Sequence, residues 1–282
     1  MISSIEAAFE HKWLDVVLAA VCAVFFTLGV ISGLPRKEDG QTIRIVAPLL
    51  PPQIEENGTG REARIIEAAF AAGGIAKKIE FHVMPFTRHW QAFATNERFA
   101  AVTTVPADVK ITGIRSTPYI DYQNGVFYRR ADHPRGLGRD PLRTLASSRI
   151  VTFAGSTAIL PQLQQLSATA PIYIERADQL SHSVMLENGF VDAVIADELI
   201  FEFYTRELLE AQFDRFAKTL AFAPVFCATP YQMVFRDFEL RQAFNEGLQK
   251  IRRSGLLRRI NLQYANDNEI ARQSVRRAGC PK

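Results

Sequence analysis

The sequence has little cysteine and little bias of charge, and each shortage excludes a class of function. Only three cysteines occur among the 282 residues, and no Cys-x-x-Cys pair or Cys/His cluster is present, so a structural zinc site is not indicated. The 33 basic and 30 acidic residues leave a net charge of +3 and form no basic stripe of the kind that binds a phosphate backbone. We therefore expect no metal, no cofactor and no nucleic acid.

The usual catalytic motifs are also missing. The five histidines form no H-E-x-x-H pair, and no serine stands in G-x-S-x-G, so the common hydrolase patterns are absent. Residues 58–63, GTGREA, match a dinucleotide-binding turn, but they follow two prolines, and Glu55 and Glu56 would repel a pyrophosphate. The sequence therefore predicts a binding protein with no catalytic residues, not an enzyme.

One long apolar run lies near the N-terminus. Residues 16–34, VVLAAVCAVFFTLGVISGL, carry no charge and could cross about 30 Å of hydrocarbon as a helix. Two interpretations stay open: residues 1–36 are a cleaved signal peptide or an uncleaved membrane anchor. Both predict a periplasmic location, either free or tethered to the inner membrane. Beyond this run, Cys227 and Cys280 form a bridge or remain two thiols.

The rest of the chain alternates apolar runs with helical patterns, which predicts an α/β fold. Strands are expected at residues 43–49, 79–84, 99–103, 125–128, 150–153, 172–174, 191–195 and 231–235, and helices at 62–72, 88–95, 157–165, 179–187, 198–208 and 237–254. The pattern restarts after the turn-rich residues 131–141, ADHPRGLGRDP. A single restart predicts two lobes.

The helix expected at residues 237–254 decides the lobe assignment. Its apolar residues recur at helical spacing on one face, which must cover a surface. Because the second α/β set is complete without this helix, we expect the chain to return to the first lobe through hinge strands. The expected parts of this monomer are lobe 1 at residues 42–129 and 224–266, lobe 2 at 130–223, and a tail at 267–282.

A series of short motifs now gives a resemblance. They are Pro51-Pro52 with Gly58, MPFTRHW at 84–90, VTTVPADVK at 102–110, STPY at 116–119, FAGST at 153–157 and VDAVIADE at 191–198. In this order they resemble the family 3 solute-binding proteins of polar amino-acid ABC transporters, over residues 42–265.

The resemblance implies a periplasmic-binding-protein type II clamshell behind the N-terminal apolar helix. Such a protein captures a small polar solute, amino-acid-like or a small organic anion, and delivers it to an ABC transporter permease in the inner membrane. Two alternatives stay open on the same fold. One is a membrane-tethered sensory module, and the other is a dehydratase-like enzyme.

Three residues of the second lobe are candidate ligand contacts. Ser156 and Thr157 follow a glycine turn that enters a helix, so their hydroxyls and backbone N–H groups are expected to meet the negative end of a solute. Asp197 ends a strand at its carboxyl end, where α/β sheets place ligand contacts, and the resemblance implies that it holds an α-amino group. For all three residues, simple capping of the helix is the alternative.

Five residues of the first lobe complete the candidate site: Arg88, Thr103, Thr104, Lys110 and Tyr119. Thr103 and Thr104 follow a strand, and the resemblance implies an arginine soon after them that grips a carboxylate with two hydrogen bonds. This chain has Lys110 near that place, so Lys110 or Arg88 is expected to help instead, and the missing arginine argues against a standard α-amino acid. Three aromatic residues are expected as cleft walls or as core: Phe86, Trp90 and Tyr119.

Overall fold

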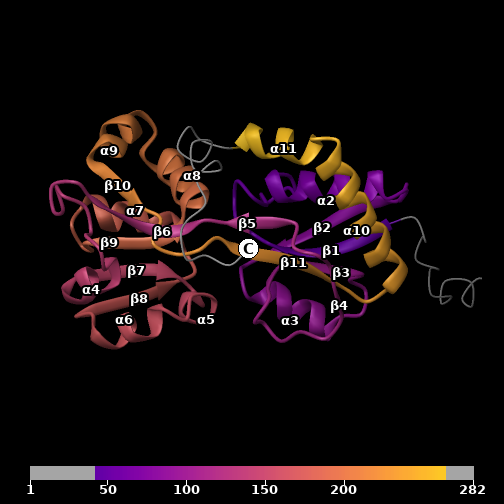
Figure 1. Ribbon diagram of the computed structural model, residues 1–282, viewed down its shortest axis with the longest axis horizontal. Coiled ribbons are helices and arrows are strands. Elements are labelled where there is room, and N and C mark those ends of the chain that lie inside the picture. Colours follow the sequence, from indigo (N-terminus) through magenta and orange to yellow (C-terminus); the bar gives the residue numbers. More distant parts are fainter. Residues whose placement is uncertain (1–41, 265–282) are drawn as a thin grey trace, which may run out of the picture. The chain divides into compact units, whose positions relative to one another are not determined.

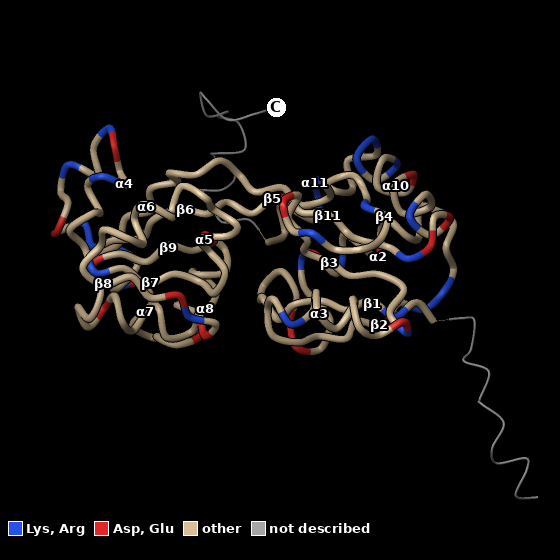
Figure 2. The backbone as a smooth tube through the Cα atoms, turned by 90° about the horizontal axis from the view of Figure 1, so that it is seen from below, with Lys and Arg blue, Asp and Glu red and all other residues tan. Residues whose placement is uncertain are grey.

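The computed structural model describes residues 42–264, which form two mixed β-sheets covered by helices (Figure 1). The apolar run at residues 16–34, Cys280 and the expected tail at 267–282 lie outside the described residues. Within residues 42–264, no helix combines the length and apolar character needed to span a membrane. Basic and acidic residues are interspersed around both sheets (Figure 2).

The first sheet has the strand order β2-β1-β3-β11-β4, and β5 also pairs with β11. The strands are β1 (Thr42–Pro48), β2 (Lys78–Met84), β3 (Ala101–Pro106), β4 (Ile114–Arg115), β5 (Ile120–Tyr122) and β11 (Thr229–Phe235). Strand β1 is parallel to β2 and β3, whereas β11 is antiparallel to β3, β4 and β5. The parallel strands are linked by helices, as βαβ units require.

Helices cover both faces of the first sheet. One face carries α2 (Arg61–Ala72), α10 (Phe238–Arg253) and α11 (Leu256–Tyr264), and the other carries α3 (Arg88–Thr95) (Figure 1). The ring of Phe244 on α10 lies 5.4 Å from that of Phe70 on α2 and 5.5 Å from that of Phe235 on β11. The amphipathic helix expected at 237–254 therefore packs on the first sheet and its helix α2.

The second sheet has the order β10-β6-β9-β7-β8. Its strands are β6 (Asn124–Arg129), β7 (Arg149–Phe153), β8 (Ile172–Arg176), β9 (Ala193–Asp197) and β10 (Leu220–Ala223). Its helices are α4 (Pro141–Thr144), α5 (Ser156–Ile159), α6 (Leu163–Thr169), α7 (Leu180–Glu187), α8 (Glu198–Leu209) and α9 (Phe213–Thr219). Sequence analysis assigned residues 124–129 to the first lobe, but this strand pairs with β9 and β10 in the second sheet.

Most expected elements are present, and the differences have local causes. The helix expected at 157–165 is two short helices, α5 and α6, separated around Pro161. Proline has no backbone N–H, and it disfavours helical geometry in the residue before it. Strands β4, β5 and β10 were not expected. They have two to four residues each, too few to show an alternation of apolar and polar side chains.

Two chain segments connect the sheets, one from β5 to β6 and one from β10 to β11. Gln123, between β5 and β6, joins them directly: its Nε2 donates to the carbonyl oxygen of Phe226 at 3.0 Å and to that of Asn124 at 2.9 Å. The Nδ2 of Asn124 also donates to Thr229 Oγ1 at 3.5 Å. The two connections therefore lie side by side and are hydrogen-bonded to each other.

Candidate functional site

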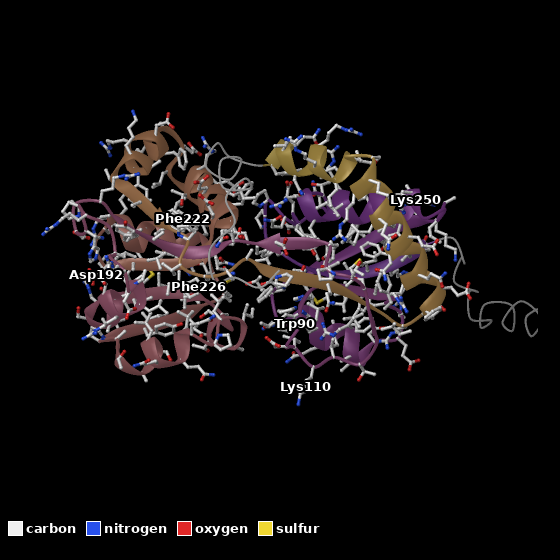
Figure 3. All side chains as sticks on the ribbon, in the orientation of Figure 1. Trp90, Lys110, Asp192, Phe222, Phe226 and Lys250 are labelled. Atoms are coloured by element: carbon white, nitrogen blue, oxygen red, sulfur yellow. The ribbon has the colours of Figure 1, made fainter. Side chains whose placement is uncertain are left out.

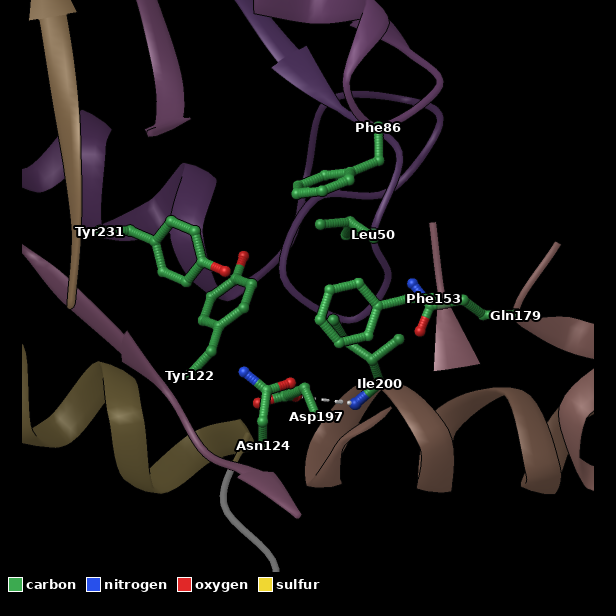
Figure 4. Close-up of a pocket in the computed structure, with 9 residues that line it drawn as sticks. All are labelled: Leu50, Phe86, Tyr122, Asn124, Phe153, Gln179, Asp197, Ile200 and Tyr231. Atoms are coloured by element: carbon green, nitrogen blue, oxygen red, sulfur yellow. Dashed lines mark hydrogen bonds between the residues drawn. The ribbon is translucent and has the colours of Figure 1, made fainter. Parts of the chain in front are cut away.

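A pocket lies beside the two connections and takes residues from both sheets (Figure 4). The space between these residues amounts to about 290 Å³ when the adjoining open solvent is included. The described residues that line it are Leu50, Phe86, Tyr122, Asn124, Phe153, Gln179, Asp197, Ile200 and Tyr231.

Asp197 is the acidic residue of this lining, and it is 5% exposed. It ends β9 and precedes α8, and its Oδ1 accepts a hydrogen bond from the backbone N–H of Ile200 at 3.1 Å. The carboxylate therefore caps the helix and also faces the pocket (Figure 4). The two roles that the sequence left open are compatible, because a carboxylate can accept about four hydrogen bonds.

The other polar groups of the lining include both donors and acceptors. Gln179 Oε1 is buried and accepts no hydrogen bond from a described residue. The hydroxyl of Tyr122 donates its hydrogen to Glu62 Oε2 at 2.6 Å, which leaves its oxygen to accept. Burial raises the pKa of Tyr231, and Asp197 and Glu62 raise it further, so this phenol stays protonated and can donate.

Four aromatic rings form much of the remaining wall: Phe86, Tyr122, Phe153 and Tyr231. The rings of Tyr122 and Tyr231 are 4.5 Å apart, on the side of the first sheet (Figure 4). Phe86 was expected as a cleft wall or as core, and it lies at the pocket. Trp90 and Tyr119, the other two aromatic candidates, are not among the lining residues.

Ser156 and Thr157 form the expected cradle for an anion, and a carboxylate of the chain itself fills it. Glu175 on β8 accepts hydrogen bonds from Ser156 Oγ at 2.9 Å, from Thr157 Oγ1 at 2.8 Å and from the N–H of Thr157 at 3.0 Å. The N–H of Gly155 donates to the other Glu175 oxygen at 2.8 Å. Burial works to raise the pKa of Glu175, but these bonds outweigh it and lower the pKa below its ordinary value.

Thr103, Thr104 and Tyr119 gather around a second internal carboxylate, that of Glu62. Thr104 Oγ1 donates to Glu62 Oε1 at 2.7 Å, and the hydroxyl of Tyr119 donates to the same oxygen. Thr103 Oγ1 lies 2.9 Å from Thr104 Oγ1. Burial raises the pKa of Glu62, while the hydroxyl donors work to lower it. These three candidates form a buried network behind Tyr122 and do not line the pocket.

The two expected cations lie on the surface. Arg88 begins α3 with an exposed side chain, and Lys110 is exposed in the loop after β3. Figure 3 shows Lys110 projecting away from the body of the protein. Neither residue is among the described lining of the pocket. Of the eight expected contacts, Asp197 alone belongs to that lining.

Sequence reasoning missed most of the pocket residues. Tyr122, Asn124 and Tyr231 lie on the strands next to the connections between the sheets, and locating these connections requires the strand pairing. Phe153 lies in the FAGST motif, of which only the serine and the threonine were expected to contact a ligand. The two tyrosines and the asparagine near the predicted hinges could have indicated the pocket.

The described residues contain no cluster that suggests a metal-binding site. Among residues 42–264, no group of three or more His, Cys, Asp or Glu side chains could hold a metal ion. Cys227 is disulfide-bonded. Both other cysteines, Cys22 and Cys280, lie outside the described residues, so the pairing of Cys227 with Cys280 stays a prediction.

No family model matches the chain, and no curated protein matches it. Solved structures do. A histidine kinase sensor domain with similarity to periplasmic binding proteins has 19% sequence identity and a TM-score of 0.64, covering 80% of this chain and 96% of its own. An ancestral amino-acid-binding protein, a precursor of cyclohexadienyl dehydratase, has 16% identity and a TM-score of 0.63, covering 80% and 96%.

A third similar structure is ArtJ, the arginine-, lysine-, histidine-binding protein of Geobacillus stearothermophilus. It has 17% identity and a TM-score of 0.60, covering 79% of this chain and 94% of its own. These likenesses confirm the expected fold: the chain is an α/β protein with two mixed sheets and the fold of the periplasmic binding proteins. At such identities the likeness extends to the fold alone.

Proposed function

We propose that this chain is an exported solute-binding protein that captures a small polar solute in the pocket and delivers it to an ABC transporter permease. The observation that carries the proposal is the composition of the pocket, whose walls come from both sheets beside the two connections. A solute held there contacts both sheets at once, so it can stabilise one arrangement of them over others. Similarity to amino-acid-binding proteins supports the same function.

A ligand screen tests this function directly. A solute that binds only the folded chain stabilises it and so raises its melting temperature. At a solute concentration of a hundredfold Kd, the free energy of unfolding rises by about 2.7 kcal/mol. The screen contains amino acids, opines, polyamines and small organic acids. We expect at least one compound to raise the melting temperature, and to do so less for Phe153→Ala, which removes one wall of the pocket. A screen in which no compound raises it would count against solute binding.

A tethered sensory module is the second candidate, because a histidine kinase sensor domain has the same fold. Fractionation of expressed cells, with mass measurement of the N-terminus, separates a free carrier from a tethered protein. Similarity to the precursor of a dehydratase leaves an enzyme as the third candidate. Turnover of a prephenate-like acid would favour that candidate, and we expect none, since the pocket's described lining contains a single ionisable acid and no histidine.

A further inference from the structure

Cys227 lies in the second connection between the sheets, after β10 and before β11, and its sulfur is disulfide-bonded. A single chain makes up the structure, and the sequence holds two other cysteines, Cys22 and Cys280, so one of them is the partner. Cys22 belongs to the apolar run at residues 16–34, which is either removed with a signal peptide or inserted in the membrane. Neither state leaves its sulfur beside the folded domain. Cys280 is therefore the partner that fits an exported protein.

This pairing brings the C-terminal segment, residues 265–282, back to the connection. The last described helix, α11, ends at Tyr264, whose side chain packs against the apolar cluster of the first sheet. Sixteen residues lead from Tyr264 to Cys280, and extended backbone of that length covers up to about 50 Å. A disulfide requires the two Cα atoms to lie within about 7 Å of each other. The segment then runs from the first sheet to the connection.

The start of α8 offers this segment a surface of opposite charge. Glu198 and Glu202 are one turn apart on α8, and Glu198 is only 2% exposed. A carboxylate at such depth needs a partner, and neither acid is without one. The segment at residues 265–282 carries four basic residues against two acidic ones. Its charge therefore complements that of the start of α8.

Hydrogen bonds place this acidic start of α8 next to Cys227. The backbone N–H of Glu198 donates to the carbonyl oxygen of Gln123 at 3.1 Å. In turn, Gln123 Nε2 donates to the carbonyl oxygen of Phe226 at 3.0 Å, and Phe226 is the residue before Cys227. The acids and the cysteine therefore lie on adjoining parts of the molecule, and one segment can contact both.

We propose that residues 265–282 form a strap that is closed by a disulfide between Cys227 and Cys280 and whose arginines pair with the acids at the start of α8. Arg276 and Arg277 precede Cys280 by four and three residues, which keeps both within reach of these acids. The strap joins α11 on the first sheet to α8 on the second (Figure 1). It therefore restrains movement of the sheets about the two connections. This role goes beyond the proposed function and does not depend on which solute binds.

Peptide mapping of the exported chain without reductant tests the disulfide. Trypsin should release residues 219–236 linked to residues 278–282, because these tryptic peptides hold Cys227 and Cys280. A free Cys227 thiol, or a bond from Cys227 to any other cysteine, overturns the proposal.

The arginines of the strap also report whether it is docked, because trypsin cleaves after them. Limited proteolysis, followed by mass spectrometry, should cut the strap of the folded parent slowly and that of Cys280→Ser at least about fivefold faster. Glu202→Lys keeps the disulfide but repels the arginines, so cleavage should be about two- to fivefold faster than in the parent. Glu207→Lys is the matched control, because Glu207 is an exposed acid on another side of α8, and its strap should be cut at the parent's rate.

Hydrogen exchange measures the restraint itself. Exchange at residues 123–126 and 224–228 should quicken at least about threefold in Cys280→Ser, while exchange at residues 244–251 of α10 should not change. Equal cleavage of the strap in Glu202→Lys and Glu207→Lys would show that the acids do not hold the segment. That result, equal cleavage in Cys280→Ser and the parent, or unchanged exchange at the connections overturns the strap and leaves solute binding unaffected.

Discussion

At the scale of single residues, the buried carboxylate of Glu62 and the exposed residue Glu175 satisfy groups that a ligand was expected to meet. Glu175 occupies the cradle of Ser156 and Thr157, and Glu62 collects the hydroxyls of Thr104 and Tyr119. The sequence correctly indicated polar groups at the ends of strands. It could not show that other carboxylates of the chain fill them, because Glu175 reaches the cradle only through the parallel register of β7 and β8, which sets Thr152 opposite Glu175.

The two carboxylates predict opposite dependences of stability on pH. The pKa of Glu62 is raised by burial above its ordinary value of 4.5, so its contribution is present below that pH and is lost as the pH rises through the folded-state pKa. Glu62→Gln, which cannot ionise, should therefore gain stability relative to the parent as the pH rises from 4.5 to 8. Urea denaturation at several pH values measures the difference in free energy of unfolding.

Glu175→Gln is the comparison for this measurement. The pKa of Glu175 lies below its ordinary value of 4.5, so its contribution is present above that pH and is lost as the pH falls through the folded-state pKa. This variant should lose stability relative to the parent as the pH rises from below the folded-state pKa to 4.5, and the difference should then stay constant up to pH 8. A common trend for both variants would show that the two carboxylates do not differ in the way their surroundings predict.

At the scale of elements, periodicity predicted the helices and longer strands well but not how closely they approach. The apolar face of α10 was readable because Phe244, Leu248 and Ile251 recur at helical spacing. The close contact of α10 with α2 could not be predicted from the sequence. A Cβ on Gly247 would lie 1.7 Å from the carbonyl oxygen of Ala69, and that oxygen belongs to a helix near the start of the described chain.

This contact predicts the effect of Gly247→Ala. Alanine favours a helix by about 1 kcal/mol over glycine, but here its methyl group would overlap the backbone of α2, and overpacking typically costs about 1–3 kcal/mol or more. We expect a net loss of stability in chemical denaturation. Gln249→Ala, an exposed change in the same helix, should alter stability by less than about 0.5 kcal/mol. A Gly247→Ala variant more stable than the parent would contradict the contact.

At the scale of the whole molecule, the sequence predicted two α/β parts joined by two connections, and it misplaced one strand. Strand β6 was assigned to the first part because a turn-rich stretch follows it, whereas its pairing with β9 and β10 places it in the second sheet. A change of composition therefore marked a surface loop within the second sheet. The true passage between sheets is at Gln123, where the chain continues from β5 into β6 without a turn signal.

Gln123 allows a test of the connections as a unit. Its Nε2 donates to two carbonyl oxygens, one on each connection, and Gln123→Glu replaces this donor with an oxygen of nearly the same size. Losing both hydrogen bonds should cost about 1–3 kcal/mol near neutral pH. Below about pH 4, a protonated glutamate regains a donor, so part of the loss should disappear.

Gln212→Glu supplies the matched control, because Gln212 is exposed and accepts a hydrogen bond from Arg215 at 3.0 Å through an oxygen that glutamate retains. Urea denaturation of both variants and the parent at pH 7.5 and pH 4 gives the comparison. Hydrogen exchange should also quicken near Phe226 in Gln123→Glu alone, since that residue's carbonyl oxygen loses the hydrogen bond from Gln123. If the two variants are equally stable, the hydrogen bonds of Gln123 do not hold the connections together, and the pocket beside them must owe its geometry to the packing of Tyr122 and Tyr231 instead.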